Sequence, residues 1–176
     1  INLVDTARPF TKKLSNELGE TVHVGILEED KAIYILKDES NYTIRMYSRV
    51  GKAIPLYCTA IGKIFLSYMS EKDLDSYLDT HPLRPFTPKS IKNVDALKEE
   101  LRLVRKRGWS IDDEEHEENI MCIGAPIFDY TNSVVAAISV SFPLFRFDKE
   151  NFELIIDKIT TTSNEISKLL GYEKED

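Results

Sequence analysis

The stretch of sequence that most restricts the fold is Gly108-Trp-Ser-Ile-Asp-Asp-Glu-Glu-His-Glu-Glu-Asn-Ile-Met-Cys-Ile-Gly-Ala-Pro-Ile-Phe-Asp129. A dense run of carboxylates leads directly into an apolar run that contains one thiol, Cys122. A short polar turn then precedes a second apolar run, Val134–Phe142, in which alternation places Ser139 and Ser141 on one face. The two apolar runs predict a β-hairpin. A carboxylate loop, a thiol and two strand hydroxyls so close together are typical of a domain that holds a small polar ligand against a sheet.

The remaining elements follow from apolar periodicity and turn residues. The expected helices are Leu3–Leu18 ended by Gly19, Ala60–Met69, Glu71–Leu78 capped by Ser70, the region from Val94 to Val104 closed by Gly108, and a helix from Phe152 that ends near Gly171. The expected strands are Thr21–Leu27, Ala32–Lys37, Thr43–Ser48, Trp109–Asp112, Ile120–Phe128 and Val134–Phe142. Strands and helices do not alternate, so we predict an α+β fold in which helices pack on an antiparallel sheet.

The length and composition indicate one globular domain with an ordinary core. The chain has 176 residues, of which 42% are hydrophobic and 30% charged. Its net charge of -7 and pI of about 5.1 describe a surface that repels phosphate backbones, which argues against nucleic-acid binding by this chain itself. No apolar run approaches the ~20 residues that a membrane-spanning helix needs.

The cysteine content and the first residues add two expectations. Cys58 and Cys122 both lie in apolar sequence and form no CxxC pair, which predicts free thiols in a cytoplasmic protein. The chain begins with Ile1 and Asn2, without methionine or a signal-peptide pattern, so we expect a fragment that lacks its N-terminal part.

The serine pair and the thiol are candidate ligand groups. Ser139 and Ser141 lie in a strand that is apolar on both faces, so their hydroxyls need hydrogen-bond partners. They either donate to a ligand in a gap left by small side chains, or bond locally to backbone or water. Strand pairing can bring Cys122 beside them. A single buried cysteine is more often a small apolar side chain than a reactive group.

A second candidate is the turn that enters the predicted helix at Ala60. The segment Pro55-Leu-Tyr-Cys-Thr-Ala-Ile-Gly-Lys63 offers the unpaired amides of a helix N-terminus, where an anion can bind. Ala60 and Gly62 would let a carboxylate approach closely. The alternative is a plain helix start capped by Thr59. The segment lacks the spacing of a nucleotide-binding P-loop, so we reject that reading.

The acidic run over residues 112–118 is more typical of a solvated face than of a site. The histidines at 23, 81 and 116 form no zinc-binding pattern, and we predict neither a metal nor a cofactor. A pairing of Cys122 with His116 as nucleophile and base is conceivable, but the sequence offers no third group to orient the base.

Three segments together resemble the effector-binding domain of IclR-type bacterial transcription regulators. They are the segment Pro55–Lys63, the segment Gly108–Asp129 and the strand with Ser139 and Ser141. The resemblance covers essentially the whole chain. The runs Tyr-Thr-Ile-Arg-Met-Tyr-Ser-Arg at 42–49, Thr-Ala-Ile-Gly-Lys at 59–63, Ser-Val-Ser-Phe-Pro at 139–143 and Arg-Phe at 146–147 look most like regulators of 2-keto-3-deoxygluconate and of pectin or hexuronate catabolism.

The resemblance implies a GAF-like or profilin-like domain spanning residues 1–176, homodimers or homotetramers, and a winged helix-turn-helix DNA-binding domain outside this chain. It also implies a set of ligand-binding residues. The amides of Ala60, Ile61 and Gly62 would bind the ligand carboxylate, the polar end would meet Asp112, Cys122, Ser139 and Ser141, and Met46, Ile54 and Ile120 would form an apolar wall. Tyr57 is a departure, since many relatives have histidine there.

We therefore expect a sensing module that binds a small organic acid, such as the 2-keto acid 2-keto-3-deoxygluconate, and controls DNA binding by an attached domain. It would not be an enzyme, and would not contact a membrane. One alternative is a small cysteine-dependent enzyme on a GAF-like fold, with a reactive Cys122. Another is a structural dimerisation domain without a ligand.

Overall fold

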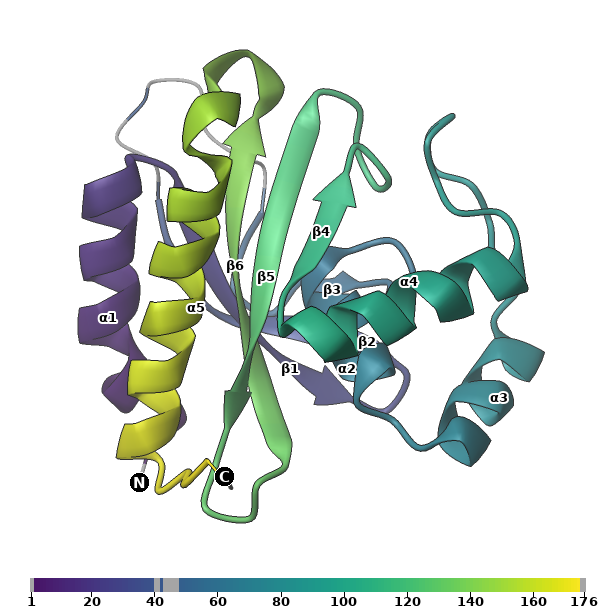
Figure 1. The fold of residues 1–176 in the computed structure, drawn as a ribbon, viewed down its shortest axis with the longest axis horizontal. Coiled ribbons are helices and arrows are strands. Elements are labelled where there is room, and N and C mark those ends of the chain that lie inside the picture. Colours follow the sequence, from purple (N-terminus) through teal and green to yellow (C-terminus); the bar gives the residue numbers. More distant parts are fainter. Residues whose placement is uncertain (1, 40–41, 43–47, 175–176) are drawn as a thin grey trace.

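The structure is a computed structural model that describes residues 2–39, 42 and 48–174. Its centre is a six-stranded antiparallel sheet of order β3-β2-β1-β6-β5-β4, with helices on both faces (Figure 1). The strands are β1 (Thr21–Glu28), β2 (Lys31–Asp38), β3 (Ala53–Ile54), β4 (Ser110–Asp113), β5 (Ile120–Phe128) and β6 (Val134–Pro143). The helices are α1 (Leu3–Leu18), α2 (Ala60–Ser67), α3 (Glu71–Thr80), α4 (Val94–Arg107) and α5 (Phe152–Leu169). The predicted α+β fold is confirmed.

Local capping chemistry sets several helix boundaries where the sequence places them. Gly19 (φ 72°) ends α1 and Gly108 (φ 83°) ends α4, both in the left-handed conformation that glycine adopts without steric cost. The Ser70 hydroxyl accepts a hydrogen bond of 3.1 Å from the Asp73 N–H and so begins α3. These ends depend on neighbouring residues only, which is why the sequence predicts them.

Some predicted details differ from the structure. The helix predicted to reach Met69 ends at Ser67. The short strand β3 and two 3₁₀ turns, Leu144–Arg146 and Lys149–Asn151, have no counterpart in the sequence prediction. Of the predicted strand Thr43–Ser48, residues 43–47 lie outside the described part of the chain, and only Ser48 is described.

The helices divide into two layers on opposite faces of the sheet. In Figure 1, α1 and α5 lie side by side against one face, while α2, α3 and α4 lie on the other. Strand β6 sits between β1 and β5, and it is buried on both faces, as its sequence predicts. Ile138 and Val140 enter the core beneath α1 and α5, whereas Ala137 enters the core beneath α2 and α4. The two serines of β6 face this second layer.

Candidate ligand-binding site

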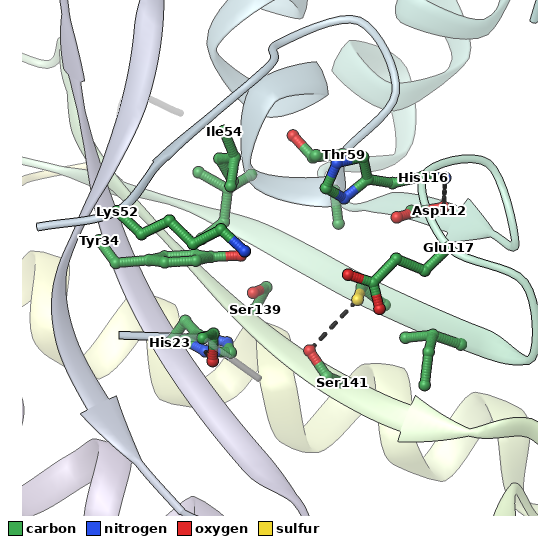
Figure 2. A pocket seen from close by; sticks show the side chains of 15 residues that line it. His23, Tyr34, Lys52, Ile54, Thr59, Asp112, His116, Glu117, Ser139 and Ser141 are labelled. Carbon is green, nitrogen blue, oxygen red and sulfur yellow. Dashed lines mark hydrogen bonds between the residues drawn. The ribbon is translucent and has the colours of Figure 1, made fainter. Parts of the chain in front are cut away.

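A cavity of about 40 Å³ lies between the sheet and the loop that enters α2 (Figure 2). Since one water needs roughly 10–15 Å³ of such space, the cavity has room for about three waters. It is lined by His23, Tyr34, Ser48, Lys52, Ile54, Thr59, Ala60, Ile61, Asp112, His116, Glu117, Ile120, Cys122, Ser139 and Ser141. Its wall therefore combines a few apolar side chains with many hydrogen-bonding groups, as a binding site for a small polar molecule does.

The strand register brings the polar lining together. Asp112 on β4 pairs with Cys122 on β5, which pairs with Ser141 on β6. Next along β6, on the same face, Ser139 pairs with His23 on β1. Directly paired residues of neighbouring strands point to the same face. Four strands thus place one polar group after another along the cavity floor.

The two serine hydroxyls have no backbone partner among the described residues. The Ser141 Oγ lies 3.2 Å from the Cys122 Sγ, and either atom can donate. The Ser139 side chain is buried, and within residues 2–39, 42 and 48–174 no hydrogen bond engages its hydroxyl. Of the alternative drawn from sequence, local bonding of both serines to backbone or water, the backbone part is not found among the described residues. At least the Ser139 hydroxyl is open to a ligand.

The start of α2 supplies two more donors. Thr59 caps the helix, its Oγ accepting a 3.0 Å hydrogen bond from the Gly62 N–H and its carbonyl a 2.9 Å bond from the Lys63 N–H. The N–H groups of Ala60 and Ile61 precede these in the first turn and have no partner in the described part of the chain. Because both residues line the cavity, their amides can bind an anion there.

Gly62 has a different role from the predicted one. It does not line the cavity, and its N–H is already used by the helix cap. A Cβ at this position would lie 2.3 Å from the backbone of Leu56, so glycine is needed for a close approach of two backbone segments rather than for a ligand. The same loop is held to the sheet by the Ser110 Oγ, which donates a 2.7 Å hydrogen bond to the Ala60 carbonyl.

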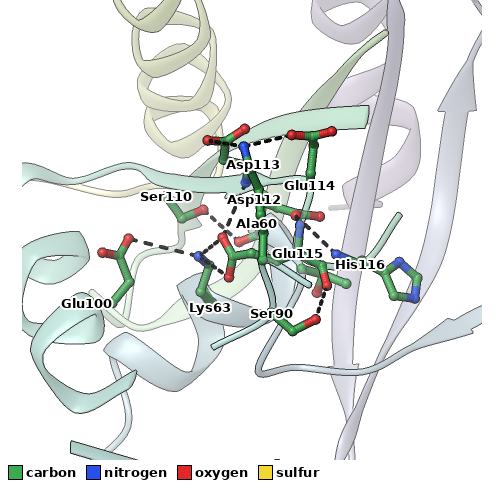
Figure 3. Close-up of polar contacts among 12 residues, drawn as sticks. Ala60, Lys63, Ser90, Glu100, Ser110, Asp112, Asp113, Glu114, Glu115 and His116 are labelled. Carbon is green, nitrogen blue, oxygen red and sulfur yellow. Dashed lines mark hydrogen bonds and ion pairs between the residues drawn. The ribbon is translucent and has the colours of Figure 1, made fainter. Parts of the chain in front are cut away.

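The acidic segment is organised by a buried lysine (Figure 3). The Lys63 Nζ lies 2.8 and 3.0 Å from the two carboxylate oxygens of Glu115, and 3.9 Å from Glu100. The prediction of a solvated acidic face is wrong for Asp112 and Glu115, which are 4% and 7% exposed. Lys63 provides the counter-charge that makes their burial tolerable, and the sequence did not indicate this pairing.

Burial changes the protonation of the polar groups at the cavity. Burial raises the pKa of Asp112 to about 7, although its carboxylate accepts a 2.7 Å hydrogen bond from the Glu115 N–H. Burial, with the nearby Asp112, also raises the pKa of the Cys122 thiol well above its usual range. At neutral pH the thiol is protonated and Asp112 is divided between its two forms. Both side chains can therefore donate hydrogen bonds, which an acidic ligand needs.

Most of the predicted binding residues meet at this cavity. Ile54, Ala60, Ile61, Asp112, Ile120, Cys122, Ser139 and Ser141 all line it. Met46 lies outside the described residues. The sequence analysis missed His23, Tyr34, Ser48, Lys52, Thr59, His116 and Glu117 as lining residues. Strand alternation alone could not select His23, because that choice requires the register between β1 and β6.

Residues 1–168 match the family described as the C-terminal part of the bacterial transcriptional regulator IclR. The chain belongs to this IclR family. One family member, the transcriptional regulator KdgR of Escherichia coli, is 37% identical over 172 residues that cover 98% of this chain and 65% of KdgR. This chain thus spans just under two thirds of the length of that relative.

Solved structures of IclR proteins share the fold. The C-terminal domain of E. coli KdgR superposes with a TM-score of 0.88 at 34% identity, covering 98% of this chain and all of that one. The IclR protein of Thermotoga maritima gives 0.92 at 40% identity, with 98% of this chain and 70% of the other covered. A double mutant of the inducer-binding domain of the transcription factor PobR from Acinetobacter, solved in a complex with 3-hydroxybenzoic acid, gives 0.89 at 21% identity, with 96% and 99% covered. The similarity to PobR therefore shows a shared fold and nothing more.

In the described part of the chain, no helix is long and apolar enough to cross a membrane. Within the same residues, no three histidine, cysteine, aspartate or glutamate side chains gather in a way that could hold a metal ion. His23 and His116 line the same cavity as Asp112, Glu117 and Cys122, but among the described residues these side chains do not come close enough together to hold a metal ion.

Proposed function

We propose that this domain senses a small organic acid and that the cavity between β1, β5, β6 and the start of α2 is its binding site. The observation that carries the proposal is the placement of unpaired donors around one cavity: the amides of Ala60 and Ile61 and the hydroxyl of Ser139. A domain of the same fold, a double mutant of the inducer-binding domain of PobR, binds 3-hydroxybenzoic acid in its crystal structure. Because the chain belongs to a family of transcriptional regulators, ligand binding would serve to control transcription.

The proposed ligand is a 2-keto acid such as 2-keto-3-deoxygluconate, and because the cavity has room for about three waters, an acid of this size requires the cavity to widen as it binds. Its carboxylate would accept hydrogen bonds from the amides of Ala60 and Ile61, where the helix dipole favours negative charge. Its keto and hydroxyl groups would meet Asp112, Cys122 and the serines of β6. Likeness to KdgR supports this ligand class, and the free donors support an acid with several oxygen atoms.

The ligand would act on DNA binding through segments outside this chain. A ligand shifts an equilibrium between two arrangements only by the difference between its affinities for them. We infer that a homodimer or homotetramer of the full regulator has two such arrangements, and that the filled cavity favours one of them. The acidic surface of this domain agrees with DNA being bound elsewhere in the regulator.

We propose further that the site carries out no chemistry. A catalytic cysteine needs a lowered pKa, whereas burial raises the pKa of Cys122. We expect alkylation of Cys122 at neutral pH to be slower than that of a small free thiol. Rapid alkylation would favour the cysteine-dependent enzyme instead.

The proposal is tested by thermal unfolding of this domain with 2-keto-3-deoxygluconate, pyruvate, glyoxylate or glucuronate. A ligand that binds only the folded state stabilises it by about 2.7 kcal/mol at ~100 times its Kd, so we expect a rise of several degrees with a keto acid. The variant carrying Ser139→Ala and Ser141→Ala should lose most of that rise. An unchanged affinity in this variant, or no response to any acid at millimolar concentration, would contradict the proposal.

A further inference from the structure

One cavity residue has a hydrogen-bonding atom that nothing in the described structure satisfies. His23 is 1% exposed, and its Nδ1 is the buried side-chain nitrogen or oxygen that lacks a partner within residues 2–39, 42 and 48–174. Leaving such an atom unpaired costs on the order of 1–3 kcal/mol. A ligand in the cavity that forms a hydrogen bond with this nitrogen would remove that free-energy cost.

The rest of the His23 ring is held in place. Its Nε2 lies 2.7 Å from the Ser48 hydroxyl, and the ring stacks on Tyr34 with centroids 4.3 Å apart. Ser139, whose hydroxyl is also without a partner in the described residues, pairs with His23 across β1 and β6. Figure 2 shows His23 and Ser139 together on the cavity floor. The two free groups therefore lie next to each other.

The protonation state of His23 defines what it can bind. Burial, together with Lys37 and Lys52, lowers its pKa to about 3, so the imidazole is neutral at physiological pH. One ring nitrogen carries a hydrogen and the other accepts. If Nε2 donates to Ser48, Nδ1 accepts from a ligand hydroxyl; if Nε2 accepts, Nδ1 donates to a ligand hydroxyl or carbonyl oxygen. A ligand hydroxyl satisfies either tautomer, whereas a carboxylate satisfies only the one in which Nδ1 donates.

His23 also lies at a distance from the amides of α2. The Ala60 carbonyl would be 3.2 Å from a Cβ on Gly124, so the start of α2 sits above β5 at this point. Gly124 pairs with Ser139, and Ser139 with His23, which places His23 two strands away along the sheet. Two strand spacings are about 10 Å. An acid longer than pyruvate can therefore extend from the amides across β6 toward His23.

We propose that His23 is a specificity-determining residue of the effector site, and that its Nδ1 hydrogen-bonds a hydroxyl or carbonyl oxygen at the end of the effector remote from the carboxylate. This inference rests on the proposed function, since it assumes an acid in the cavity. It adds that the domain distinguishes longer, hydroxylated acids from short keto acids through a residue on β1.

Two matched substitutions test the role of each ring nitrogen. The amide of asparagine lies as many bonds from Cα as the histidine Nδ1, and the amide of glutamine as many as Nε2. His23→Gln therefore keeps a partner for Ser48 and loses the group at Nδ1, whereas His23→Asn does the reverse. We expect His23→Gln to weaken binding of 2-keto-3-deoxygluconate about tenfold or more, and His23→Asn to weaken it by clearly less.

Titration calorimetry with 2-keto-3-deoxygluconate and pyruvate, on wild type and both variants, gives the readout. Pyruvate affinity should be the same in wild type and His23→Gln, and the melting temperatures of the free proteins show that both variants fold. Loss of affinity in His23→Asn with none in His23→Gln would overturn the inference, because it would assign His23 only the task of holding Ser48. If wild type and His23→Gln bind 2-keto-3-deoxygluconate equally well, the inference about His23 fails and the proposed function stands. If wild type binds neither 2-keto-3-deoxygluconate nor pyruvate, the proposed function fails as well.

Discussion

Among single residues, Asp112 links the cavity to pH. It lies at the end of the polar row and is 4% exposed, and burial holds its pKa at about 7. Other charged or titratable groups around it are Glu115, Lys63, His116 and the Cys122 thiol. Because the folded state binds the proton more tightly than the unfolded chain does, Asp112 contributes stability at low pH that is lost as pH rises through about 7.

Replacing Asp112 by asparagine should remove this dependence. Asp112→Asn keeps the oxygen that accepts from the Glu115 N–H and has no charge to bury. One pKa unit corresponds to about 1.4 kcal/mol, so between about pH 4 and about pH 8 the free energy of unfolding of wild type should fall relative to the variant by on the order of 3 kcal/mol. Urea unfolding at the two pH values measures the difference. Equal pH dependence in both proteins would contradict the assigned pKa shift.

Between elements, the ion pair of Lys63 and Glu115 joins α2 to the segment after β4. Both side chains are buried, and the two oxygens of Glu115 face the same ammonium group. Burial nevertheless raises the pKa of Glu115, which shows how much solvation this pair has lost. Its partner atoms come from residues 52 positions apart, so the pair fixes the acidic segment over the cavity.

Breaking this pair from one side should be more harmful than removing it. Lys63→Met leaves the Glu115 carboxylate buried and unpaired, and we expect a loss of about 3–5 kcal/mol in the free energy of unfolding. The double variant Lys63→Met with Glu115→Gln removes both charges of this pair and should recover part of that loss, although the carboxylates of Asp112 and Glu100 stay nearby. Denaturant unfolding of the single and double variants completes the cycle. Additive effects of the two changes would show that the residues do not interact.

Across the whole molecule, the sheet separates two apolar cores with different tasks. No residue of the core beneath α1 and α5 lines the cavity, whereas residues of the core beneath α2 and α4 do. Stability and ligand binding should therefore respond to different substitutions. The serines of β6 belong to the cavity side and the alternate residues of the same strand to the other core.

Ile159 on α5 provides the matching test, because its side chain is fully buried in the core far from the cavity lining. Ile159→Ala should lower the free energy of unfolding by roughly 2–5 kcal/mol through lost burial and a new cavity. The affinity for the acid, measured well below the melting temperature, should change less than about twofold, which is under ~0.5 kcal/mol. A large fall in affinity would show that the two layers are coupled.

Short-range features of the chain are the ones that sequence reasoning predicted well. Apolar periodicity placed α1, α4, α5 and every strand except β3, and glycines and serines marked several helix ends, because capping and turn formation involve residues within a few positions. Family resemblance then supplied most of the cavity residues. Alternation within β6 correctly put both serines on one face, since side-chain direction in a strand has a period of two.

The same reasoning could not predict contacts between residues that lie far apart in the sequence. The sequence gives no sign that Lys63 neutralises Glu115, that Gly62 makes room for the Leu56 backbone, or that His23 joins Ser139 on the cavity floor. Each of these depends on the register between strands or on how a helix meets the sheet. Periodicity and capping are properties of one segment, whereas register and counter-charge are properties of two. The chain therefore specifies its own elements, whereas the candidate binding site forms only once those elements are packed together.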